Sequence, residues 1–383
     1  MEVDWIVQDH EISECLSSLT VAVMTYNRPS MLENVIRYWS KWPVSILVLD
    51  GSDRPFDASA FESSPATISV YAENSINERL KYAAAMVDTP FVCLHTDDDF
   101  TLARTVAGAI AWLKKNERYT CVSGDFQLFD GRGGFGLAPA GANLDSSDPG
   151  DRVRSHLSNY QWSYVYGVQR TEQFSTTISA VLEAMTHPDF VDNPNDCAHE
   201  LGMEICGALQ GCVSRSSEVL ILRRIGNESE SSNQVPSDVW LQARDSRLAA
   251  KAWRESLSAA IAPSIGATNA QVNEWIQGAL DDFCLSVETR RRARPWQERF
   301  VSWFAHVIRP SASRSSSVFA PRSIRYRQNV QGYVYRSLRN SYRMLRGRDN
   351  HPSFELPDGI YATRAHRQDL EEIMKLCGPR LSQ

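Results

Sequence analysis

The sequence lacks the patterns that define several common classes of protein. No run of 18 or more apolar residues occurs, so we expect no membrane-spanning helix. None of the eight cysteines forms a CxxC pair and no HExxH pattern is present, which argues against a structural zinc site. The first residues, MEVDWIVQDHE, lack the apolar core of a signal peptide. These absences predict a cytoplasmic protein whose cysteines are reduced core thiols.

Lysine and aspartate are both absent from residues 285 to 348. Fifteen Arg and two Glu give this segment a charge of about +13, and the whole 383-residue chain carries −6, which leaves about −19 elsewhere. Such a split predicts an anionic partner for the basic segment, either a membrane surface or nucleic acid. Large apolar residues recur at helical spacing beside the Arg cluster: Trp296, Phe300, Trp303, Phe304 and Val307.

A basic helix with aromatic anchors is typical of a membrane interface. We therefore expect residues 285 to 348 to hold the protein at an anionic membrane surface, on the inner face of the plasma membrane. The alternative is an aromatic stripe that packs on the rest of the protein. Nucleic acid is the least favoured partner, because no nucleic-acid-binding module is recognisable.

Residues 20 to 122 alternate between short apolar segments and segments of helical periodicity. Such alternation predicts an α/β fold with a mostly parallel sheet and helices on both of its faces. The expected strands are Thr20–Met24, Val44–Leu49, Thr67–Tyr71, Pro90–His95 and Tyr119–Val122. The expected helices between them are Pro29–Trp42, Ile76–Val87 and Arg104–Lys115.

The rest of the chain adds a smaller number of elements. Residues 130 to 152 are predicted to form a loop, Tyr160–Val168 an aromatic strand and Glu218–Arg223 a last strand. Helices are expected at Thr171–Met185 and Ala198–Cys212, over most of 238 to 308, and at Ser323–Arg346. We therefore expect a catalytic domain over residues 1 to 237 and a largely helical, basic C-terminal region over residues 238 to 383.

Polar clusters follow three of the predicted strands. They are Thr25-Tyr26-Asn27-Arg28, Asp50-Gly51-Ser52-Asp53 and Asp97-Asp98-Asp99. Ligands of parallel sheets bind beyond the carboxyl ends of the strands, so these clusters predict a binding site at one edge of the sheet.

The acidic triplet at 97 to 99 fits two kinds of phosphate chemistry. Asp97-Asp98-Asp99-Phe100-Thr101-Leu102 matches the nucleophile motif of haloacid-dehalogenase phosphatases, although that motif usually follows the first strand of its domain. Carboxylates at a strand end can instead hold a divalent cation, which stabilises the charge that builds on the diphosphate of a departing nucleotide sugar. A solvated turn is the third interpretation.

Four motifs, in order, resemble bacterial inverting glycosyltransferases of the GT-A fold. TVAVMTYNRP at Thr20–Pro29 is similar to their opening strand and loop, and Asp50-Gly51-Ser52-Asp53 to the end of their second strand. Asn74–Leu80 resembles their Asn-rich helix start, and Phe91–Phe100 their DxD strand. The resemblance covers residues 20 to 125, about a quarter of the chain.

The resemblance implies a role for each matching residue. Thr25, Asn27 and Asp50 would border uracil and ribose, and Arg79 would lie near the diphosphate or the sugar. Asp97 would contact the ribose or the metal, and Asp99 would ligate Mn²⁺ or Mg²⁺, unless the alignment slides by one and Asp98 is the ligand. Arg28 and Asp98 complete the predicted nucleotide-sugar site. The alternatives to substrate binding are structural: a turn shaped by Thr25 and Asn27, and a surface ion pair of Arg79 with Glu73 or Glu78.

An inverting transferase also needs a base that deprotonates the acceptor hydroxyl. In the family it is acidic and starts a helix, which the resemblance places at Asp196–Glu204, where His199-Glu200 replaces the commoner Glu-Asp. Glu200 and Glu204 share a helix face, and two like charges there are expected to raise one pKa. Asp196 and Asp192 are the other candidates for the base, and a solvated helix face is the alternative.

Aromatic residues at alternate positions, Trp162, Tyr164 and Tyr166, are predicted to stack on an acceptor sugar, with a core strand as the alternative. Together these features predict a metal-dependent inverting glycosyltransferase. It would move a sugar from a nucleotide-sugar donor, by preference a UDP-sugar, to a glycan or lipid-linked acceptor in surface polysaccharide synthesis. A phosphotransferase, or a non-catalytic membrane or nucleic-acid adaptor on the same fold, remains the alternative.

Overall fold

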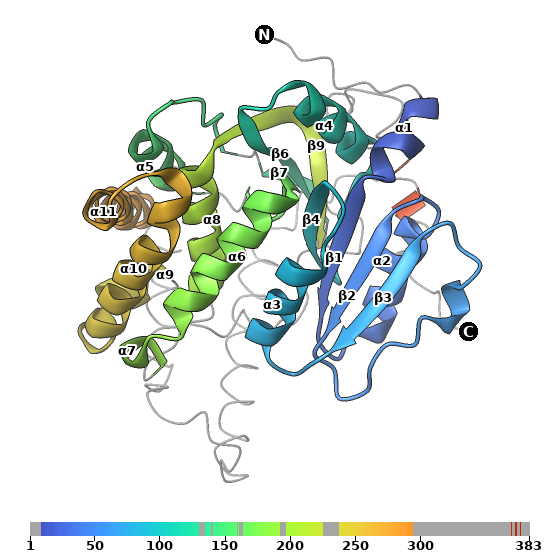
Figure 1. Cartoon of the computed structure of the whole chain (residues 1–383), viewed down its shortest axis with the longest axis horizontal. Coiled ribbons are helices and arrows are strands. Elements are labelled where there is room, and N and C mark those ends of the chain that lie inside the picture. The colour runs from blue at the N-terminus through green and yellow to red at the C-terminus, as the bar shows by residue number, and fades with distance from the viewer. Residues whose placement is uncertain are drawn as a thin grey trace, which may run out of the picture. The chain divides into compact units, whose positions relative to one another are not determined.

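The computed structural model describes most of the first 293 residues and four residues near the C-terminus (Figure 1). The described residues are 9–129, 135–138, 141–158, 160, 164–191, 197–224, 237–293, 369, 372, 373 and 376. The chain divides into two compact units, residues 1–284 with 356–383 and residues 285–355, and nearly all described residues belong to the first.

One mixed sheet forms the centre of the first unit. In the described residues its strands run in the order β3-β2-β1-β4-β8-β6-β9-β5, and β7 pairs with β6. Its first four members in sequence are β1 (Leu19–Thr25), β2 (Ser45–Asp50), β3 (Thr67–Ala72) and β4 (Phe91–Thr96). The others are β5 (Asp99–Thr101), β6 (Tyr119–Phe129), β7 (Phe135–Ala138), β8 (Val168–Arg170) and β9 (Cys212–Arg224).

The N-terminal half of the sheet is parallel, as predicted. β1 pairs in parallel with β2 on one side and with β4 on the other, and β2 pairs in parallel with β3. β6 and β9 form a further parallel pair, whereas β8 and β5 join the sheet as short antiparallel strands. The side chains of β1, β2 and β4 are almost all buried on both faces. Strands of this kind need helices above and below them.

The helices around the sheet follow from the direction of each crossover. The chain moves from β1 to β2 through α2 (Pro29–Trp39), and back from β3 to β4 through α3 (Ile76–Met86). Right-handed crossovers in opposite directions place their helices on opposite faces, and Figure 1 shows α3 and α2 on the two sides of the sheet. The remaining helices beside the strands are α1 (Asp9–Leu16), α4 (Ala103–Lys115), α6 (Thr171–Met185) and α8 (Cys197–Gln210).

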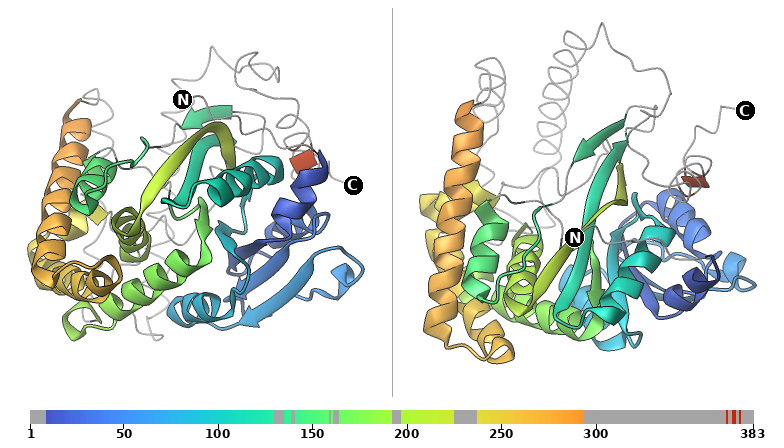
Figure 2. Two further views of the ribbon diagram at one scale, coloured as in Figure 1. Left: turned by 45° about the horizontal axis from the view of Figure 1, so that its top comes forward. Right: turned by 90° about the horizontal axis from the view of Figure 1, so that it is seen from above.

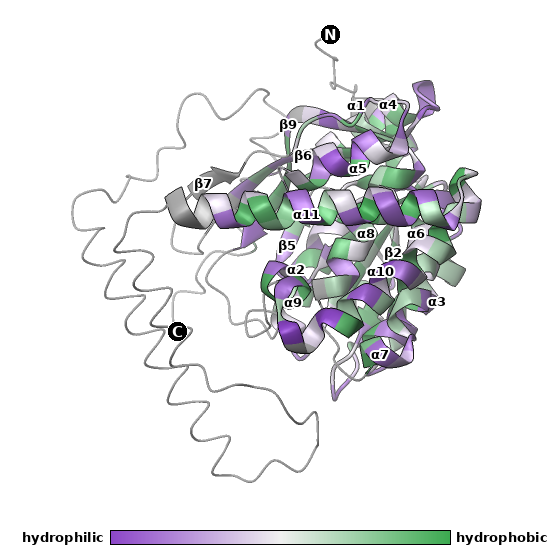
Figure 3. Ribbon diagram, turned by 90° about the vertical axis from the view of Figure 1, so that its left-hand side faces the viewer, coloured by the Kyte–Doolittle hydropathy of each residue, from purple (hydrophilic) through white to green (hydrophobic). Residues whose placement is uncertain are grey.

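A helical layer follows the last strand and packs on α6 and α8. It contains α9 (Ser237–Gln242), α10 (Arg247–Ile261) and α11 (Asn269–Ala293), with the shorter α5 (Pro149–Ser158) and α7 (Pro188–Val191) nearby. Arg254 of α10 donates to Asn273 of α11 at 2.9 Å, and Figure 2 shows α11 beside α5 and α10. Polar and apolar residues mix along α10 and α11 (Figure 3), as expected for helices with one packed face.

The expected fold class is therefore confirmed: the protein is α/β, with a mostly parallel sheet, helices around it and a helical region after it. Predicted residues 294 to 308 and Ser323–Arg346 lie outside the described residues. None of the described helices is both long and apolar enough to cross a bilayer. Among the described cysteines, Cys15, Cys93, Cys121, Cys206 and Cys212 are buried thiols that form no disulfide.

The predicted aromatic strand at Tyr160–Val168 is wrong. The described part, Tyr164 to Gly167, forms a turn in which the Gly167 amide donates to the Tyr164 carbonyl at 2.9 Å. The amides of Tyr164 and Val165 donate to the carboxylate of Glu204, so they are not available to a neighbouring strand. β8 consequently begins only at Val168.

The predicted loop over residues 130 to 152 is also interrupted by structure. β7 (Phe135–Ala138) pairs antiparallel with the last residues of β6, and α5 begins at Pro149. The loop was predicted from composition alone. Composition does not show that Phe135–Ala138 can pair with the edge of the long strand β6.

Candidate functional site

Three parallel strands bring their polar ends to one edge of the sheet. In the register, Thr25 of β1 lies beside Asp50 of β2, and Met24 lies beside Thr96 of β4. Backbone pairing continues past the strands, because the Gly51 amide donates to the carbonyl of Thr25 and the Asp97 amide donates to the carbonyl of Met24. The structure thus assembles the three predicted clusters, although Thr25 and Asp97 are 72 positions apart in the sequence.

Asp50 holds the loop that follows β2. Its Oδ1 accepts from the Ser52 amide at 2.8 Å and its Oδ2 from the Phe56 amide at 2.7 Å. Asn27 joins this loop to the one after β1. Its backbone amide donates to Ser52 Oγ at 2.7 Å, and its side chain donates to the Asp53 carboxylate and accepts from the Asp53 backbone amide. Asn27 has a φ of 53°, a left-handed conformation that Asn tolerates better than most residues. Both residues therefore shape the edge, and their contacts with a nucleotide remain a prediction.

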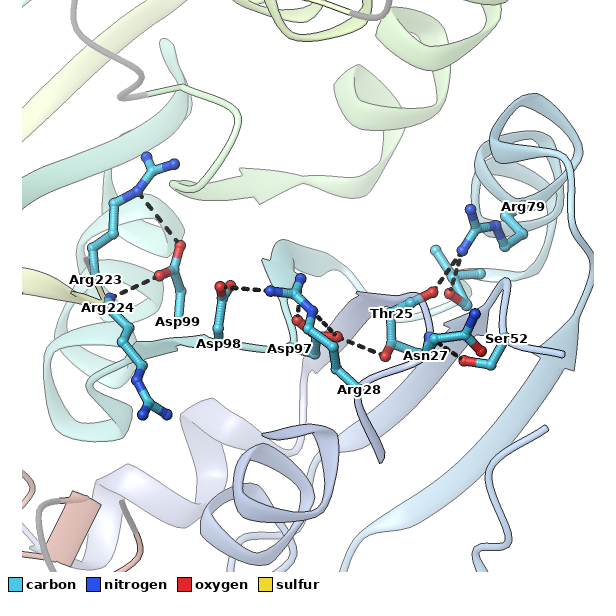
Figure 4. A network of polar contacts seen from close by, with 11 residues as sticks. Thr25, Asn27, Arg28, Ser52, Arg79, Asp97, Asp98, Asp99, Arg223 and Arg224 are labelled. Carbon is cyan, nitrogen blue, oxygen red and sulfur yellow. Dashed lines mark hydrogen bonds and ion pairs between the residues drawn. The ribbon is translucent and has the colours of Figure 1, made fainter. Parts of the chain in front are cut away.

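Arg79 lies buried beneath the same edge. Its Nη1 donates to the carbonyl of Thr25 at 2.8 Å and to that of Leu49 at 3.1 Å (Figure 4). The guanidinium lies against Gly51, where a Cβ would come within 2.6 Å of Nη1. Burial lowers the pKa of Arg79, with Asp50 opposing the effect. The alternative of a surface ion pair is wrong, because Arg79 is buried and points at two strand ends.

Arg28 offsets the charge of the first two aspartates in the triplet. Its Nη2 forms an ion pair with Asp97 Oδ1 at 2.5 Å, its Nε donates to Asp97 Oδ2 at 3.1 Å, and its Nη1 donates to Asp98 Oδ2 at 2.8 Å. Thr25 Oγ1 also donates to Asp97 Oδ2, at 2.7 Å. Burial raises the pKa of Asp97 to about 6, and the Arg28 charge opposes this rise. The carboxylate of Asp97 is thus engaged on both oxygens.

Asp99 belongs to the short strand β5, which pairs with β9. The Arg224 amide donates to Asp99 Oδ1 at 3.1 Å, and Arg223 Nε lies 3.9 Å from Asp99 Oδ2 (Figure 4). Burial raises the pKa of Asp99 to about 7, and the Arg223 charge opposes this rise. β9 begins more than 110 residues after β5 in the sequence, and the pairing of the two strands places Asp99 beside Arg223.

Glu200 lies in the first turn of α8 and accepts a hydrogen bond from Tyr166. The Tyr166 hydroxyl donates to Glu200 Oε1 at 2.8 Å, and the Arg223 guanidinium lies 5.5 Å from the centre of the Tyr166 ring. Burial raises the pKa of Glu200, and the Tyr166 hydrogen bond and the Arg223 charge oppose this rise. The expected cause, the Glu204 charge, has the smallest effect. Arg223 is thus a neighbour of both Asp99 and the Tyr166–Glu200 pair.

Glu204 occupies a different environment from Glu200. It is fully buried and accepts from the amides of Tyr164 and Val165, each at 3.0 Å, while His156 Nε2 lies 2.5 Å from its Oε2. These contacts favour a structural role over the predicted role as a base. Tyr164 is buried too, and a Cβ at Gly207 would come within 2.3 Å of its ring, so stacking on an acceptor is wrong for Tyr164.

A further contact joins the start of α8 to the donor-side motif. His199 Nε2 lies 2.6 Å from Oδ1 of Asn77, in the first turn of α3. Predicted residues Trp162, Asp192 and Asp196 lie outside the described residues. Sequence reasoning missed Arg223 and His156. Arg223 ends the apolar run EVLILR, so the rule that polar strand ends mark a site could have found it.

The carboxylates of the triplet are suited to a divalent cation only in part. Among the residues that the structure describes, no group of three His, Cys, Asp or Glu side chains could hold a metal ion. Asp98 and Asp99 offer oxygen donors, which Mn²⁺ and Mg²⁺ prefer, but Arg28 contacts both oxygens of Asp97 and also Oδ2 of Asp98, so a metal reaches these oxygens only if Arg28 releases them. Two carboxylates leave most of the coordination shell to oxygens of a bound molecule or of water, as is usual for Mg²⁺.

Comparisons with known proteins give a fold-level likeness only. No family model matches the sequence, and no curated protein matches it. Among solved structures, the chain is similar to S. aureus TarS 1-349, alone and in complex with UDP-GlcNAc or UDP, with 12% identity, a TM-score of 0.40, and coverage of 72% of this chain and 92% of that one. A longer S. aureus TarS structure matches with 11% identity and a TM-score of 0.39, over 71% of this chain and 55% of that one. At this identity and TM-score the likeness assigns no activity to this chain.

Proposed function

We propose that this chain is a metal-dependent, inverting glycosyltransferase of the GT-A type that uses a nucleotide-sugar donor. The observation that carries the proposal is the assembly of Thr25, Asp50 and the acidic triplet at one sheet edge, where the buried guanidinium of Arg79 binds the Thr25 carbonyl. The acceptor proposed is a glycan or a lipid-linked sugar.

The donor side is organised by residues that the fold holds in place. Thr25 and Asp50 end adjacent strands, and Asn27 joins the loops that follow them by hydrogen bonds, so the three residues form a fixed border for a nucleoside. Arg28, whose side chain is 26% exposed, lies over Asp97 and Asp98, where a diphosphate would meet it. Arg79 is buried, so it supports the edge from below.

Asp99, with Asp98, is the proposed ligand for Mn²⁺ or Mg²⁺. A divalent cation there would offset the charge that develops on the diphosphate as the bond to the sugar breaks. Asp99 is buried with its pKa raised to about 7, so a cation would also favour its ionised form. Asp97 instead anchors Arg28.

Glu200 is the proposed base. It would take the proton from the acceptor hydroxyl, whose oxygen then attacks the anomeric carbon on the face opposite the diphosphate. One carbon–oxygen bond forms, the bond to the diphosphate breaks, and the configuration is inverted. The raised pKa of Glu200 suits this role, because a stronger base takes a proton more readily.

Phosphoryl transfer through Asp97 is the less favoured activity. A nucleophilic aspartate must reach phosphorus with a free oxygen, but Asp97 is fully buried and both of its oxygens are engaged by Arg28 and Thr25. Asp281 and Asp282, the later acidic pair, lie in α11 and do not follow a strand.

Thermal unfolding in the presence of nucleotide sugars, with and without Mn²⁺, tests the donor and the metal. UDP-sugars are tested first, and a ligand at 100 times its Kd should stabilise the protein by about 2.7 kcal/mol. Asp99→Ala should abolish the Mn²⁺-dependent part of the shift, and Asp88→Ala, an exposed residue at the opposite end of β4, should keep it. Unchanged Mn²⁺-dependent binding in both Asp98→Ala and Asp99→Ala contradicts the metal assignment.

Transfer assays test the base. Glu200→Gln should lower transfer by about 10²-fold or more and keep donor binding, because the amide cannot accept the proton. Normal transfer by Glu200→Gln together with loss in Glu204→Gln would show that the other carboxylate is the base.

A further inference from the structure

Two glutamates of α8, four positions apart, contact the same turn. Glu204 accepts from the backbone amides of Tyr164 and Val165, and Glu200 accepts from the side chain of Tyr166. The turn lies immediately before β8, which pairs with both β4 and β6. It therefore connects the helix that carries the proposed base to the middle of the sheet.

The backbone of the turn is held from several sides. His156 of α5 lies 2.5 Å from Glu204, and both side chains are buried. Gln169 donates to the carbonyls of Tyr164 and Val165, each at 3.1 Å. Because both the amides and the carbonyls of these two residues are engaged, the direction in which Tyr166 leaves the turn is determined.

Tyr166 reaches Glu200 with its ring covered. The residue is only 5% exposed, and its ring lies under the guanidinium of Arg223. A ring covered in this way does not offer a free face to a sugar, which contradicts the expectation that Tyr166 stacks on an acceptor. Its hydroxyl is instead bound to the carboxylate oxygen Oε1 of Glu200 at 2.8 Å.

We propose that Tyr166 is a positioning residue for Glu200, and that Glu204 acts one step behind it by holding the turn that carries Tyr166. This inference rests on the proposed function, because it assigns Glu200 as the base. The Tyr166 hydroxyl fixes one oxygen of the carboxylate, which sets the direction of the other oxygen toward the acceptor hydroxyl. Arg223 holds the ring and, through Asp99, links this group to the donor edge.

The substitutions Tyr166→Phe and Tyr166→Leu separate positioning from stacking. Phe keeps the ring under Arg223 and removes only the hydroxyl, whereas Leu removes the ring. A misplaced base lowers the rate of the chemical step. Tyr166→Phe should therefore lower kcat by roughly 10- to 100-fold, with little change in the KM for the donor or for the acceptor. The matched control is Tyr119→Phe, which removes a 2.9 Å hydrogen bond to Asp145 away from the site and should keep normal kcat.

The outcomes discriminate between the two roles. Normal kcat in Tyr166→Phe, with a raised acceptor KM only in Tyr166→Leu, would overturn the proposal and restore a stacking role.

A double-mutant unfolding cycle tests the contact between Tyr166 and Glu200. The combined change in Tm for Tyr166→Phe and Glu200→Gln should be smaller than the sum of the two single changes, and additive changes would also overturn the proposal. This cycle needs no substrate, so wild-type protein that transfers no sugar contradicts the proposed function separately. Glu204→Gln should lower kcat as Tyr166→Phe does; if it does not fold, the Tyr166 variants still decide.

Discussion

At the scale of single residues, arginines from two parts of the chain contact the aspartates of the triplet. Asp97 lies in the fork of Arg28, Asp98 shares that arginine, and Asp99 faces the backbone of Arg224 and the side chain of Arg223. The three carboxylates therefore do not act as one acidic cluster. Two arginines from distant parts of the chain balance them, and burial raises the pKa of Asp97 and of Asp99.

The raised pKa of Asp99 predicts how stability depends on pH in protein free of metal. Its folded pKa is about 7 against an ordinary value of 3.8, so the folded state holds a proton that the unfolded state releases between these values. Stability from this group is present below pH 4 and is lost as pH rises toward 7, with a slope of up to about 1.4 kcal/mol per pH unit.

Unfolding of the wild type and of Asp99→Asn from pH 4 to 7.5, in a chelating buffer, measures this effect as the difference between the two proteins. The wild type should lose stability relative to the variant as pH rises. Addition of Mn²⁺ near pH 7 should stabilise the wild type more than the variant. Parallel pH profiles for the two proteins would contradict a buried Asp99 with a raised pKa.

At the scale of elements, α8 connects the core to the site. Gly207 lets the Tyr164 ring approach the helix, because a Cβ there would lie 2.3 Å from the ring. Glu204 and Glu200 lie three and seven positions before Gly207, and both contact the turn at Tyr164 to Tyr166. Packing at Gly207 and hydrogen bonding at Glu204 thus act on one turn of the chain.

Two glycines in helices should respond to alanine with opposite signs. Gly207→Ala forces Tyr164 to move, so it should destabilise the protein by about 1–3 kcal/mol and lower kcat with it. Gly278→Ala in α11 meets only the flexible end of Arg154, at 3.0 Å, and should stabilise the protein by about 0.4–1 kcal/mol. Denaturant unfolding measures both values. Equal effects of the two substitutions would show that the contact with Tyr164 is unimportant.

At the scale of the whole molecule, residues near the C-terminus complete the first unit. Asp369 is fully buried; it pairs with the guanidinium of Arg104 and accepts from the Arg104 amide, in the first turn of α4, at 3.2 Å. Ile373 is also fully buried, and Glu372 pairs with Lys41. A helix start near the triplet is therefore capped by a residue 265 positions away in the chain.

Loss of this cap should destabilise the protein. Asp369→Ala removes the partner of a first-turn amide and of Arg104, and we expect a loss of about 1–3 kcal/mol in the free energy of unfolding. Glu372→Gln, at the more exposed ion pair with Lys41, should cost less than about 1 kcal/mol. If Asp369→Ala leaves the free energy of unfolding unchanged, the docking of this segment on α4 is contradicted.

The Arg-rich segment carries the remaining prediction at this scale. Residues 285 to 348 bear a charge of about +13, and most of them lie outside the described residues. We expect the full chain to sediment with anionic vesicles at low salt and much less at high salt. A chain that lacks residues 289 to 355 but keeps the segment with Asp369 should stay in solution and keep nucleotide binding. Insolubility of this shorter chain would favour an aromatic stripe that packs on the protein, and tight RNA binding without vesicle binding would favour nucleic acid.

The local sequence determined the elements of the N-terminal half of this protein. Short apolar runs that end in polar residues, separated by helical periodicity, suffice for strands such as β1 and β2 and for α6, whose bounds match the prediction. The convergence of Thr25, Asp50 and Asp97 followed from the same pattern, because parallel strands end at a common edge.

Only the tertiary structure decided which charges meet and which aromatic residues are covered. Arg223 lies opposite Asp99 because of the register of β5 and β9, two strands far apart in the sequence. The alternation around Tyr166 is typical of a strand, yet the segment forms a turn because Glu204 on α8 accepts hydrogen bonds from the amides of Tyr164 and Val165. Periodicity reports only local preference, whereas burial and long-range hydrogen bonds depend on where distant elements pack.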